Sequence, residues 1–333
     1  MHHTPKVSIV IVNYNGAQFI ENLFKSLYQQ TYRDFEVIFV DNNSQDNSLQ
    51  LLQKLINEYK PDFPIKIIKN KENLGYCKGN NIGVKHAKGE YIILLNNDVI
   101  LDKNAVKELV KTLDQNPDIT ASQSRLLDYE AKRLVSDGYQ LDYYGYVQRL
   151  ILLNKAKKLS PFFVSYASGI VRKKDYIKVG GFDEKLTYGD YDFCWRLRLI
   201  GKDFTSTPTS ICRHYGSFTW KKMLKLPQRL HRIHKEIIRV LLKNYSLKNI
   251  IKRLPIALTI MAIESIRLSQ KHRNPAYIVS FIKAITWNLT VLKDTIQKRQ
   301  YIQKIRTVDD NEIENKMVKK PIYLTRNWVK VIK

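Results

Sequence analysis

Several nearly continuous apolar runs in this chain each stop at a cluster of Asn and Asp residues. The clearest run, Tyr91–Leu95, is followed directly by Asn96, Asn97 and Asp98. An unbroken apolar run of this kind is typical of a strand covered on both faces, as in a parallel sheet. Because such a strand cannot bury a carboxylate, Asp98 is expected at its end, where a cation can reach it. Three more runs end in the same way, over residues 7–12, 35–40 and 65–68.

Segments with apolar residues at helical spacing separate these runs. Phe19, Leu23, Phe24 and Leu27 follow the first run, and similar patterns follow later ones. This alternation of strand and helix predicts an α/β fold with a mainly parallel central sheet. In such a sheet, ligands bind in the crevice beyond the carboxyl ends of the strands. The four polar clusters are therefore expected to meet at one active-site edge.

Charge divides the chain into two parts. Residues 1–216 carry 30 Lys and Arg against 24 Asp and Glu, whereas residues 217–333 carry 26 against 7, a net charge of +19. We expect a catalytic domain over 1–216 and a basic, mainly helical region over 217–333. The excess predicts a polyanionic partner for the second part, and a membrane surface, a phosphorylated lipid and nucleic acid are all of that kind.

Helices in the basic region are expected at Met223–Lys243, Leu247–Gln270 and Ala276–Arg306, before a polar tail from Thr307. No stretch in this region reaches the roughly 18 uncharged apolar residues of a spanning helix. Basic amphipathic helices that lie on a membrane surface are therefore favoured. An ordinary helical subdomain with a solvated charged face is the alternative.

The cysteines and the amino terminus bear on the compartment. Cys77, Cys194 and Cys212 are odd in number and lack C-x-x-C spacing, which argues against a disulfide framework or a cysteine zinc site. Residues 1–6 lead directly into the first strand and leave no room for the apolar segment of a signal peptide. We expect a cytoplasmic protein, peripheral on the inner face of the cell membrane.

The middle of the chain departs from the strand and helix alternation. Residues 138–163 are irregular and rich in Tyr, which predicts a long functional loop or a small subdomain. A strand is expected next, over Phe163–Val171. A two-glycine break then precedes a helix expected from about Asp190 to Ile200.

Oxygen-bearing side chains at the strand ends suit a ligand that carries phosphate. Asp98 is a candidate ligand for a divalent cation, since Mg²⁺ usually combines one or two carboxylates with water and substrate phosphate. Asp41, at the end of the second strand, is a candidate acceptor of hydrogen bonds from a ribose or base. Residues 73–81 contain two glycines, Lys78 and several Asn side chains ahead of a helix, a combination that can also bind phosphate. Ser44 and Asp46 are better interpreted as helix caps.

Seven motifs follow one another in a characteristic order. They are VSIVIVNYN, VDNNS, NLGYCKGNN, LLNNDV, ASGI, GGFDE and DYDFCWRLR. Together they resemble the family 2 glycosyltransferases with a GT-A fold, in particular rhamnosyltransferase-like enzymes of surface polysaccharide assembly. The likeness covers about residues 6–216. It implies a nucleoside-diphosphate sugar donor and a divalent cation, Mg²⁺ or Mn²⁺.

The resemblance also implies binding residues. Those that would hold the nucleotide sugar are Asn13, Tyr14, Asn15, Asp41, Asn73, Gly75, Lys78 and Asn97. Asp98, the one acidic position in the chain's version of the family's D-x-D element, would bind the metal together with His214. Ser168 and Gly169 would border the acceptor.

The family's catalytic base lies in a Glu-Asp pair, where this chain has Gly189 and Asp190. Asp190 is therefore the expected base of a single displacement that inverts the sugar, and it would take the proton of an acceptor hydroxyl. Asp192 is better interpreted as structural, because it can pair with Arg196 at i,i+4. Since no Q-x-x-R-W motif occurs, we expect transfer of one sugar per encounter to a lipid-linked or polysaccharide acceptor.

Two other functions stay open at this stage. A sugar nucleotidyltransferase would use a related sheet and a metal, although the first strand lacks a glycine-rich basic segment for a triphosphate. A basic nucleic-acid-binding protein would explain the charge of residues 217–333, but not the Asn and Asp clusters.

Overall fold

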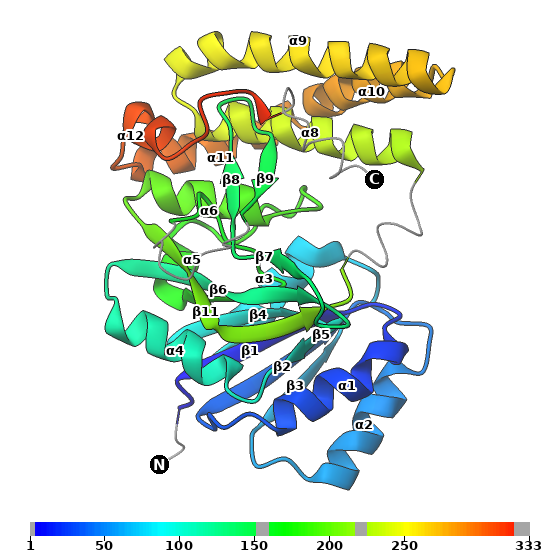
Figure 1. Ribbon diagram of the computed structural model, residues 1–333, viewed down its shortest axis with the longest axis vertical. Helices are drawn as coiled ribbons and strands as arrows, with labels where there is room; N and C mark the ends of the chain where they lie inside the picture. The colour runs from blue at the N-terminus through cyan, green and yellow to red at the C-terminus, as the bar shows by residue number, and fades with distance from the viewer. Residues whose placement is uncertain (1–3, 151–159, 217–224, 323–333) are drawn as a thin grey trace. The chain divides into compact units, whose positions relative to one another are not determined.

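The computed structural model describes residues 4–150, 160–216 and 225–322 (Figure 1). The chain forms two units, each described in turn below. Unit 1 comprises Met1–Tyr139, Arg149–Leu197 and Lys202–Gly216. Unit 2 comprises Gln140–Gln148, Arg198–Gly201 and Ser217–Lys333.

A nine-stranded sheet forms the centre of unit 1, in the order β3-β2-β1-β4-β10-β6-β11-β5, with β7 paired to β6. One half of the sheet is parallel, as the apolar runs predict. The strands of this half are β1 (Val7–Asn13), β2 (Phe35–Asp41), β3 (Ile65–Lys69) and β4 (Tyr91–Asn96). Every residue of β2 is buried, in keeping with a strand that is covered on both faces.

The other half of the sheet is mixed. Strand β10 (Ser168–Arg172) lies between β4 and β6 (Ile119–Asp128) and runs antiparallel to both. Strand β11 (Asp203–His214) is parallel to β6 and antiparallel to β5 (Val99–Leu101). The short β7 (Leu134–Ser136) pairs antiparallel with β6.

Helices cover the sheet of unit 1. Their bounds are α1 (Ala17–Tyr28), α2 (Ser48–Tyr59), α3 (Gly75–His86), α4 (Ala105–Gln115), α5 (Lys173–Lys178) and α6 (Asp190–Leu199). Leu23 and Phe24 of α1 pack in one apolar cluster with Ile9 of β1 and Leu109 of α4. Helix α3 packs against β1 and β2. Removal of this apolar surface from water is the main term that holds the strand ends at fixed positions.

The Tyr-rich segment forms a hairpin, within the region expected to be a loop or small subdomain. Strand β8 (Tyr139–Leu141) pairs with β9 (Val147–Arg149). The strand expected over Phe163–Val171 is wrong in its first half, because β10 begins only at Ser168. Phe163 makes a single bridge to Tyr139, and a turn at residues 166–167 leads into β10. Residues 151–159 lie outside the described part of the chain.

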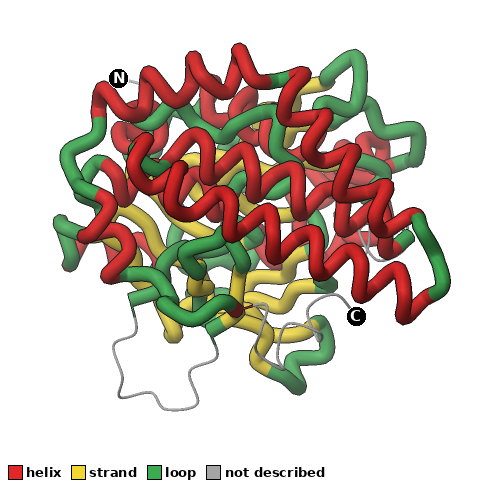
Figure 2. Tube along the Cα trace, turned by 90° about the horizontal axis from the view of Figure 1, so that it is seen from above, coloured by secondary structure: helices red, strands yellow, loops and turns green. Residues whose placement is uncertain are grey.

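Unit 2 is helical, as expected for the basic region. Its helices are α8 (Leu226–Asn244), α9 (Leu247–His272), α10 (Ala276–Thr290), α11 (Leu292–Ile305) and α12 (Asp310–Asn315), drawn in red in Figure 2. Helix α8 packs against α9, α10 and α11, so it is the central helix of this bundle. None of the helices in the described residues is long and apolar enough to cross a membrane.

Two expectations for unit 2 are corrected. The single helix expected over Ala276–Arg306 is divided at Val291, where Thr290 and Val291 are both β-branched and the Thr290 hydroxyl donates to the Trp287 carbonyl at 2.7 Å. Such a side-chain bond competes with the helix backbone. The polar tail contains α12, and the Asp309 carboxylate caps it by accepting the Glu312 amide at 2.9 Å.

Several acidic side chains in unit 2 form ion pairs or hydrogen bonds with other residues of the same unit. Glu314 pairs with Arg253 at 2.7 Å, and Asp310 pairs with Arg306 at 2.5 Å. Glu264 is fully buried and contacts His234 at 3.0 Å and the Tyr146 hydroxyl at 3.1 Å. These pairs hold the helices together, and they leave few carboxylates for the cations on the surface.

Candidate active site

The strand ends meet at one edge of the sheet, as their parallel pairing requires. In the register of β1 with its neighbours, Asn13 lies opposite Asp41, and Val12 lies opposite Asn96. Apolar side chains thus give way to Asn and Asp within one residue of the same level in β1, β2 and β4. This edge is where an open parallel sheet binds its ligands.

Asn13 is the hub of the polar groups at this edge. Its side-chain amide donates to Asp41 at 3.2 Å and to the Ser44 hydroxyl at 3.0 Å, and its Oδ1 accepts from Asn97 at 2.7 Å. Asn13 is fully buried. Gly16 permits this arrangement, since a Cβ there would lie 2.4 Å from Asn13 Oδ1 and 2.3 Å from Asn97 Nδ2. The network fixes the direction of both amide side chains.

Ser44 is a site residue that the sequence interpretation misplaced. It is not the cap of α2, because Asn47 occupies the N-cap position. Its hydroxyl donates to Asp41 at 2.6 Å and accepts the Asn15 amide at 3.0 Å. The D-x-x-S spacing was the available signal, since an Asp side chain often accepts bonds from residues just after it.

Asp46 joins two helix beginnings. Its carboxylate accepts the amide of Ala17, the first residue of α1, at 2.9 Å, and the amide of Ser48, the first residue of α2, at 3.1 Å. A carboxylate is favoured at the positive end of a helix. The structural interpretation of Asp46 therefore agrees with its position.

The third strand end and α3 supply a second cluster. Asn73 Oδ1 accepts the Gly75 amide at 3.0 Å, and the Asn42 side chain donates to the Gly75 carbonyl at 3.1 Å. Gly75 has φ +76°, a conformation that favours glycine. Lys78 is half-buried in the first turn of α3, and none of the described residues forms an ion pair with it. A cation is thus held beside the amides at the beginning of this helix.

Asp98 and His214, predicted to share a metal, lie in contact. Asp98 Oδ1 and His214 Nε2 are 3.1 Å apart, and their side chains are 12 % and 15 % exposed. Within the described residues no group of three or more His, Cys, Asp or Glu side chains forms a metal cluster. Two protein ligands fit a cation whose other ligands are substrate phosphate and water. The carboxylate oxygen is a ligand type that both Mg²⁺ and Mn²⁺ accept.

Aromatic residues next to Asp98 were missed at the sequence level. The Tyr215 amide donates to the Asp98 carbonyl at 3.1 Å. The Tyr215 ring packs on Tyr129 with 3.9 Å between centroids and on Phe19 with 4.9 Å, and the residue is 43 % exposed. Tyr14, which was predicted as a binding residue, follows the last residue of β1 and is 39 % exposed. Exposed rings at the edge of a polar crevice offer stacking surfaces to a flat ligand.

Asp190 lies at the first position of α6, as expected. Its Oδ2 accepts the Tyr166 amide at 3.0 Å, whereas its Oδ1 is shielded from solvent and has no hydrogen-bond partner. Burial raises the pKa of the Asp190 carboxyl to about 6, against the opposing effect of hydrogen bonds from the Tyr166 amide and the hydroxyls of Ser165 and Tyr76. A carboxylate with a raised pKa and an unused oxygen is equipped to accept a proton.

A short chain segment joins Asp190 to the end of β4. The amide of Tyr166 binds Asp190, and the carbonyl of the next residue, Ala167, accepts the Asn96 amide at 2.9 Å. Two consecutive residues, Tyr166 and Ala167, thus connect the carboxylate with the strand that delivers Asp98.

Gly189 has no room for a side chain. A Cβ there would lie 2.6 Å from Phe182 Cδ1 and 2.8 Å from Cys77 Sγ. The Phe182 ring is itself packed against Tyr76, Tyr166, Tyr176 and Phe193. A glutamate at this position could not be accommodated without moving that cluster, which explains how glycine fits where the family has an acidic residue.

The other predicted residues have different surroundings. Asp192 is fully buried and pairs with Arg196 at 2.9 Å, in agreement with a structural interpretation. Ser168 and Gly169 are buried inside β10, and the Ser168 hydroxyl bonds Ser124 at 2.9 Å. Their role beside an acceptor stays a prediction, and in this strand they can act only by shaping the segment before it.

Comparison with protein families agrees with this geometry. Residues 8–179 match the model of glycosyl transferase family 2, so the chain belongs to that family. An uncharacterised glycosyltransferase of Haemophilus influenzae is 27 % identical over 204 residues, which cover 57 % of this chain and 61 % of the relative. The match therefore spans less than two thirds of the relative's length.

Solved structures with the same fold include two nucleotide complexes. TarS 1–349 of S. aureus, in complex with UDP-GlcNAc, has a TM-score of 0.56 at 18 % identity, covering 95 % of this chain and 94 % of that chain. GalNAc-T7 with UDP, GalNAc and Mn²⁺ has a TM-score of 0.59 at 18 % identity, covering 71 % and 48 %. The α/β fold with a largely parallel sheet is thus the GT-A fold.

We predict that Gly189→Ala lowers the free energy of unfolding by about 1–3 kcal/mol, because it overpacks the Phe182 cluster. Thermal unfolding of the variant would measure the loss. Asp190→Asn, next to it, changes no volume, and below pH 6, where the wild-type carboxyl is protonated, it is the control that keeps wild-type stability. A Gly189→Glu variant that unfolds at the wild-type temperature would contradict the steric argument.

Proposed function

We propose that this glycosyltransferase moves a single sugar from a nucleoside-diphosphate sugar to a lipid-linked or saccharide acceptor, with inversion at the anomeric carbon and Asp190 as general base. The observation that carries the proposal is the peptide link from Asp190 through Tyr166 and Ala167 to Asn96. It ties the group that would accept a proton to the strand whose end carries Asp98.

The donor side of the proposal rests on the amides at the strand ends. Asn13, Asp41 and Asn97 form a rigid set of hydrogen-bonding groups, and Tyr14 and Asn15 follow directly on β1. Asn73 and Gly75 would approach the donor through the turn before α3. Lys78 would offset the charge of a diphosphate, since no described carboxylate competes for it.

The metal contact would be made by Asp98 and His214. A divalent cation bound there would stabilise negative charge on the departing diphosphate as a Lewis acid. The contribution of the chain is to hold one oxygen and one nitrogen donor within 3.1 Å of each other, backed by the Tyr215 amide on the Asp98 carbonyl.

The acceptor side would be completed by Asp190. Its carboxylate, whose pKa burial raises, would take the proton of an acceptor hydroxyl as the hydroxyl oxygen attacks the sugar. One carboxylate suffices for a single displacement, because no covalent intermediate needs a second nucleophile. The absence of a glutamate at position 189 is compatible with this role. The likeness to rhamnosyltransferases and the inner membrane face as a location stay predictions.

For Asp190→Asn we expect unchanged donor binding and a loss of transfer of about 10²- to 10⁴-fold, the usual contribution of a general base. Isothermal titration with UDP, dTDP and GDP and their sugars would identify the donor first. Transfer would then be followed by release of the nucleoside diphosphate. Transfer at the wild-type rate would remove Asp190 as the base.

The transfer rate should depend on pH through Asp190. Because its pKa is raised to about 6, the carboxylate is ionised and active above that pH, and kcat/KM should fall about tenfold per unit below it. The stability of the fold should depend on pH in the opposite direction to the rate. A carboxyl whose pKa is raised on folding favours the folded state at low pH and disfavours it as the pH rises past about 6. A rate profile that stays flat from pH 5 to 8 would contradict the assignment.

Asp98→Ala and His214→Ala should each weaken Mn²⁺ binding in the presence of nucleoside diphosphate by at least about tenfold, since even an outer partner of a metal ligand contributes 10- to 100-fold. Calorimetric titration with Mn²⁺ would measure this directly. Asp102→Ala, an exposed carboxylate just beyond β5, is the matched control. Equal Mn²⁺ affinity in all three variants would exclude the pair as ligands.

A further inference from the structure

Helices α9 and α10 of unit 2 expose an unusual number of large apolar side chains. The outer surface of these two helices, called here the α9–α10 outer face, is defined by the residues Leu247, Ile251, Ile256, Ile263, Ile266, Ile278, Val279, Ile282 and Leu289. Their exposed fractions run from 37 % at Ile278 to 69 % at Ile251. A helix face that meets only water is normally polar.

The helical spacing places these side chains opposite the packed faces. In α9 the buried positions include Asn249, Arg253, Ala257 and Met261, four residues apart, whereas Ile251 and Ile263 lie on the other side. In α10 the buried positions include Tyr277, Ser280, Ala284 and Asn288. Both helices pack on α8 and on each other through their buried faces. The outer face therefore has no partner among the described residues.

The charge on this face is entirely positive. Between residues 247 and 290 the one acidic residue is Glu264, which is buried against His234. The exposed charged residues of the same stretch are Lys248, Lys252, Arg267, Lys271, Arg273 and Lys283. Among the described residues none of these six cations forms an ion pair.

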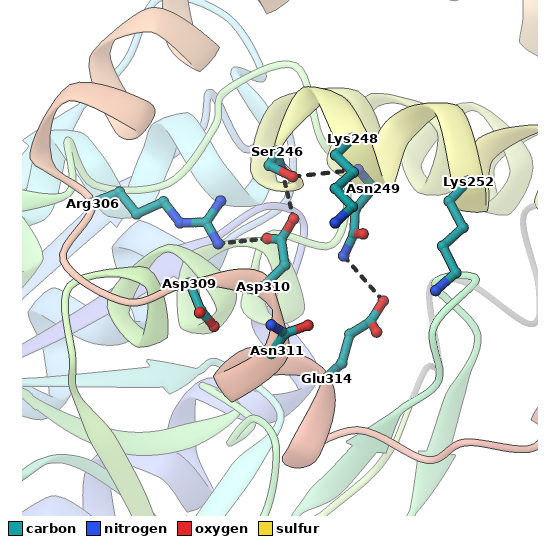
Figure 3. Close-up of a pocket in the computed structure, with 9 residues that line it drawn as sticks. All are labelled: Ser246, Lys248, Asn249, Lys252, Arg306, Asp309, Asp310, Asn311 and Glu314. Carbon is teal, nitrogen blue, oxygen red and sulfur yellow. Dashed lines mark hydrogen bonds and ion pairs between the residues drawn. The ribbon is translucent and has the colours of Figure 1, made fainter.

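In the pocket beside the start of α9, the carboxylates likewise have partners while the lysines do not pair with a carboxylate of the described chain (Figure 3). Its three carboxylates are already engaged: Asp310 accepts from Arg306 and the Ser246 amide, Glu314 accepts from Asn249, and Asp309 accepts the Glu312 amide. Lys248 and Lys252 line the pocket of about 440 Å³ without a carboxylate partner in the described chain. The cations at this end of the face are left for an external anion.

We propose that the α9–α10 outer face docks on an anionic lipid surface, with its isoleucines at the acyl boundary and its lysines on the headgroups. This deepens the proposed function, because it brings the enzyme to the surface that would hold a lipid-linked acceptor. Such a surface offers apolar depth and negative charge together, which is the combination the face presents. A second copy of the chain fits less well, because pairing like faces would oppose six cations with six.

The test is flotation of the full chain with vesicles of phosphatidylcholine alone and with added phosphatidylglycerol. We expect binding that requires the anionic lipid. The triple variant Lys248→Gln, Lys252→Gln, Arg267→Gln should bind about 100-fold more weakly, at about fivefold per cation. The triple variant Ile251→Gln, Ile263→Gln, Ile282→Gln should lose binding at any salt concentration.

Matched controls lie on exposed positions of unit 1. Ile177→Gln, 58 % exposed, controls for the apolar change, and the triple variant Lys54→Gln, Lys107→Gln, Lys111→Gln controls for charge. Both should bind vesicles as wild type does. All variants should bind nucleoside diphosphate normally, so failure of docking is distinguishable from failure of the proposed function.

Three results would overturn the proposal. Wild type that stays unbound to anionic vesicles is the first. The second is a dimer in sedimentation equilibrium that the isoleucine variant dissociates, which would make a second copy the occupant. The third is tighter, salt-sensitive binding to nucleic acid than to anionic vesicles.

Discussion

The site depends on one feature of the sheet, the insertion of an antiparallel strand into a parallel set. Strand β4 is paired with parallel β1 on one side and antiparallel β10 on the other. An antiparallel neighbour begins where β4 ends, so the chain just before β10 must lie at the carboxyl end of β4. Ser168 opposite Leu95, and the bond from Asn96 to Ala167, are direct results. Residues far apart in sequence thereby become neighbours at the crevice.

Asp190 illustrates how a reactive group is kept at some cost to the fold. Its carboxylate accepts one backbone amide, yet its second oxygen is buried without a partner, which is rare for polar atoms in folded proteins. A charge in such surroundings is unfavourable, and this is why its pKa is raised. The rigid aromatic packing of Phe182 and Phe193 holds the helix that carries it. The stability of that cluster compensates for the poorly solvated carboxylate.

Sequence patterns located the strands and their polar ends well, because burial on both faces leaves an unmistakable apolar run. They also placed Asp190 at the start of a helix and brought Asp98 and His214 together through the family resemblance. The sequence patterns failed where the role of a residue depends on neighbours from distant parts of the chain. Ser44 bonds Asn13 across two strands, and the local D-x-x-S spacing, which indicates only its bond to Asp41, does not reveal this contact. The division of α10 from α11 at Val291 was missed because both halves continue the same helical periodicity.

The steric limit at Gly189 was also beyond the sequence, since it depends on Cys77 and Phe182, which come from other parts of the chain. This limit changes how the missing glutamate is interpreted. If the site had merely lost an acidic side chain, an empty space would remain at position 189. A Gly189→Glu variant could then restore the carboxylate. Here Phe182 and Cys77 occupy the space, so the whole neighbourhood has adjusted to glycine. A single carboxylate is therefore a property of this packing, and Asp190 must do its work without an acidic neighbour at that position.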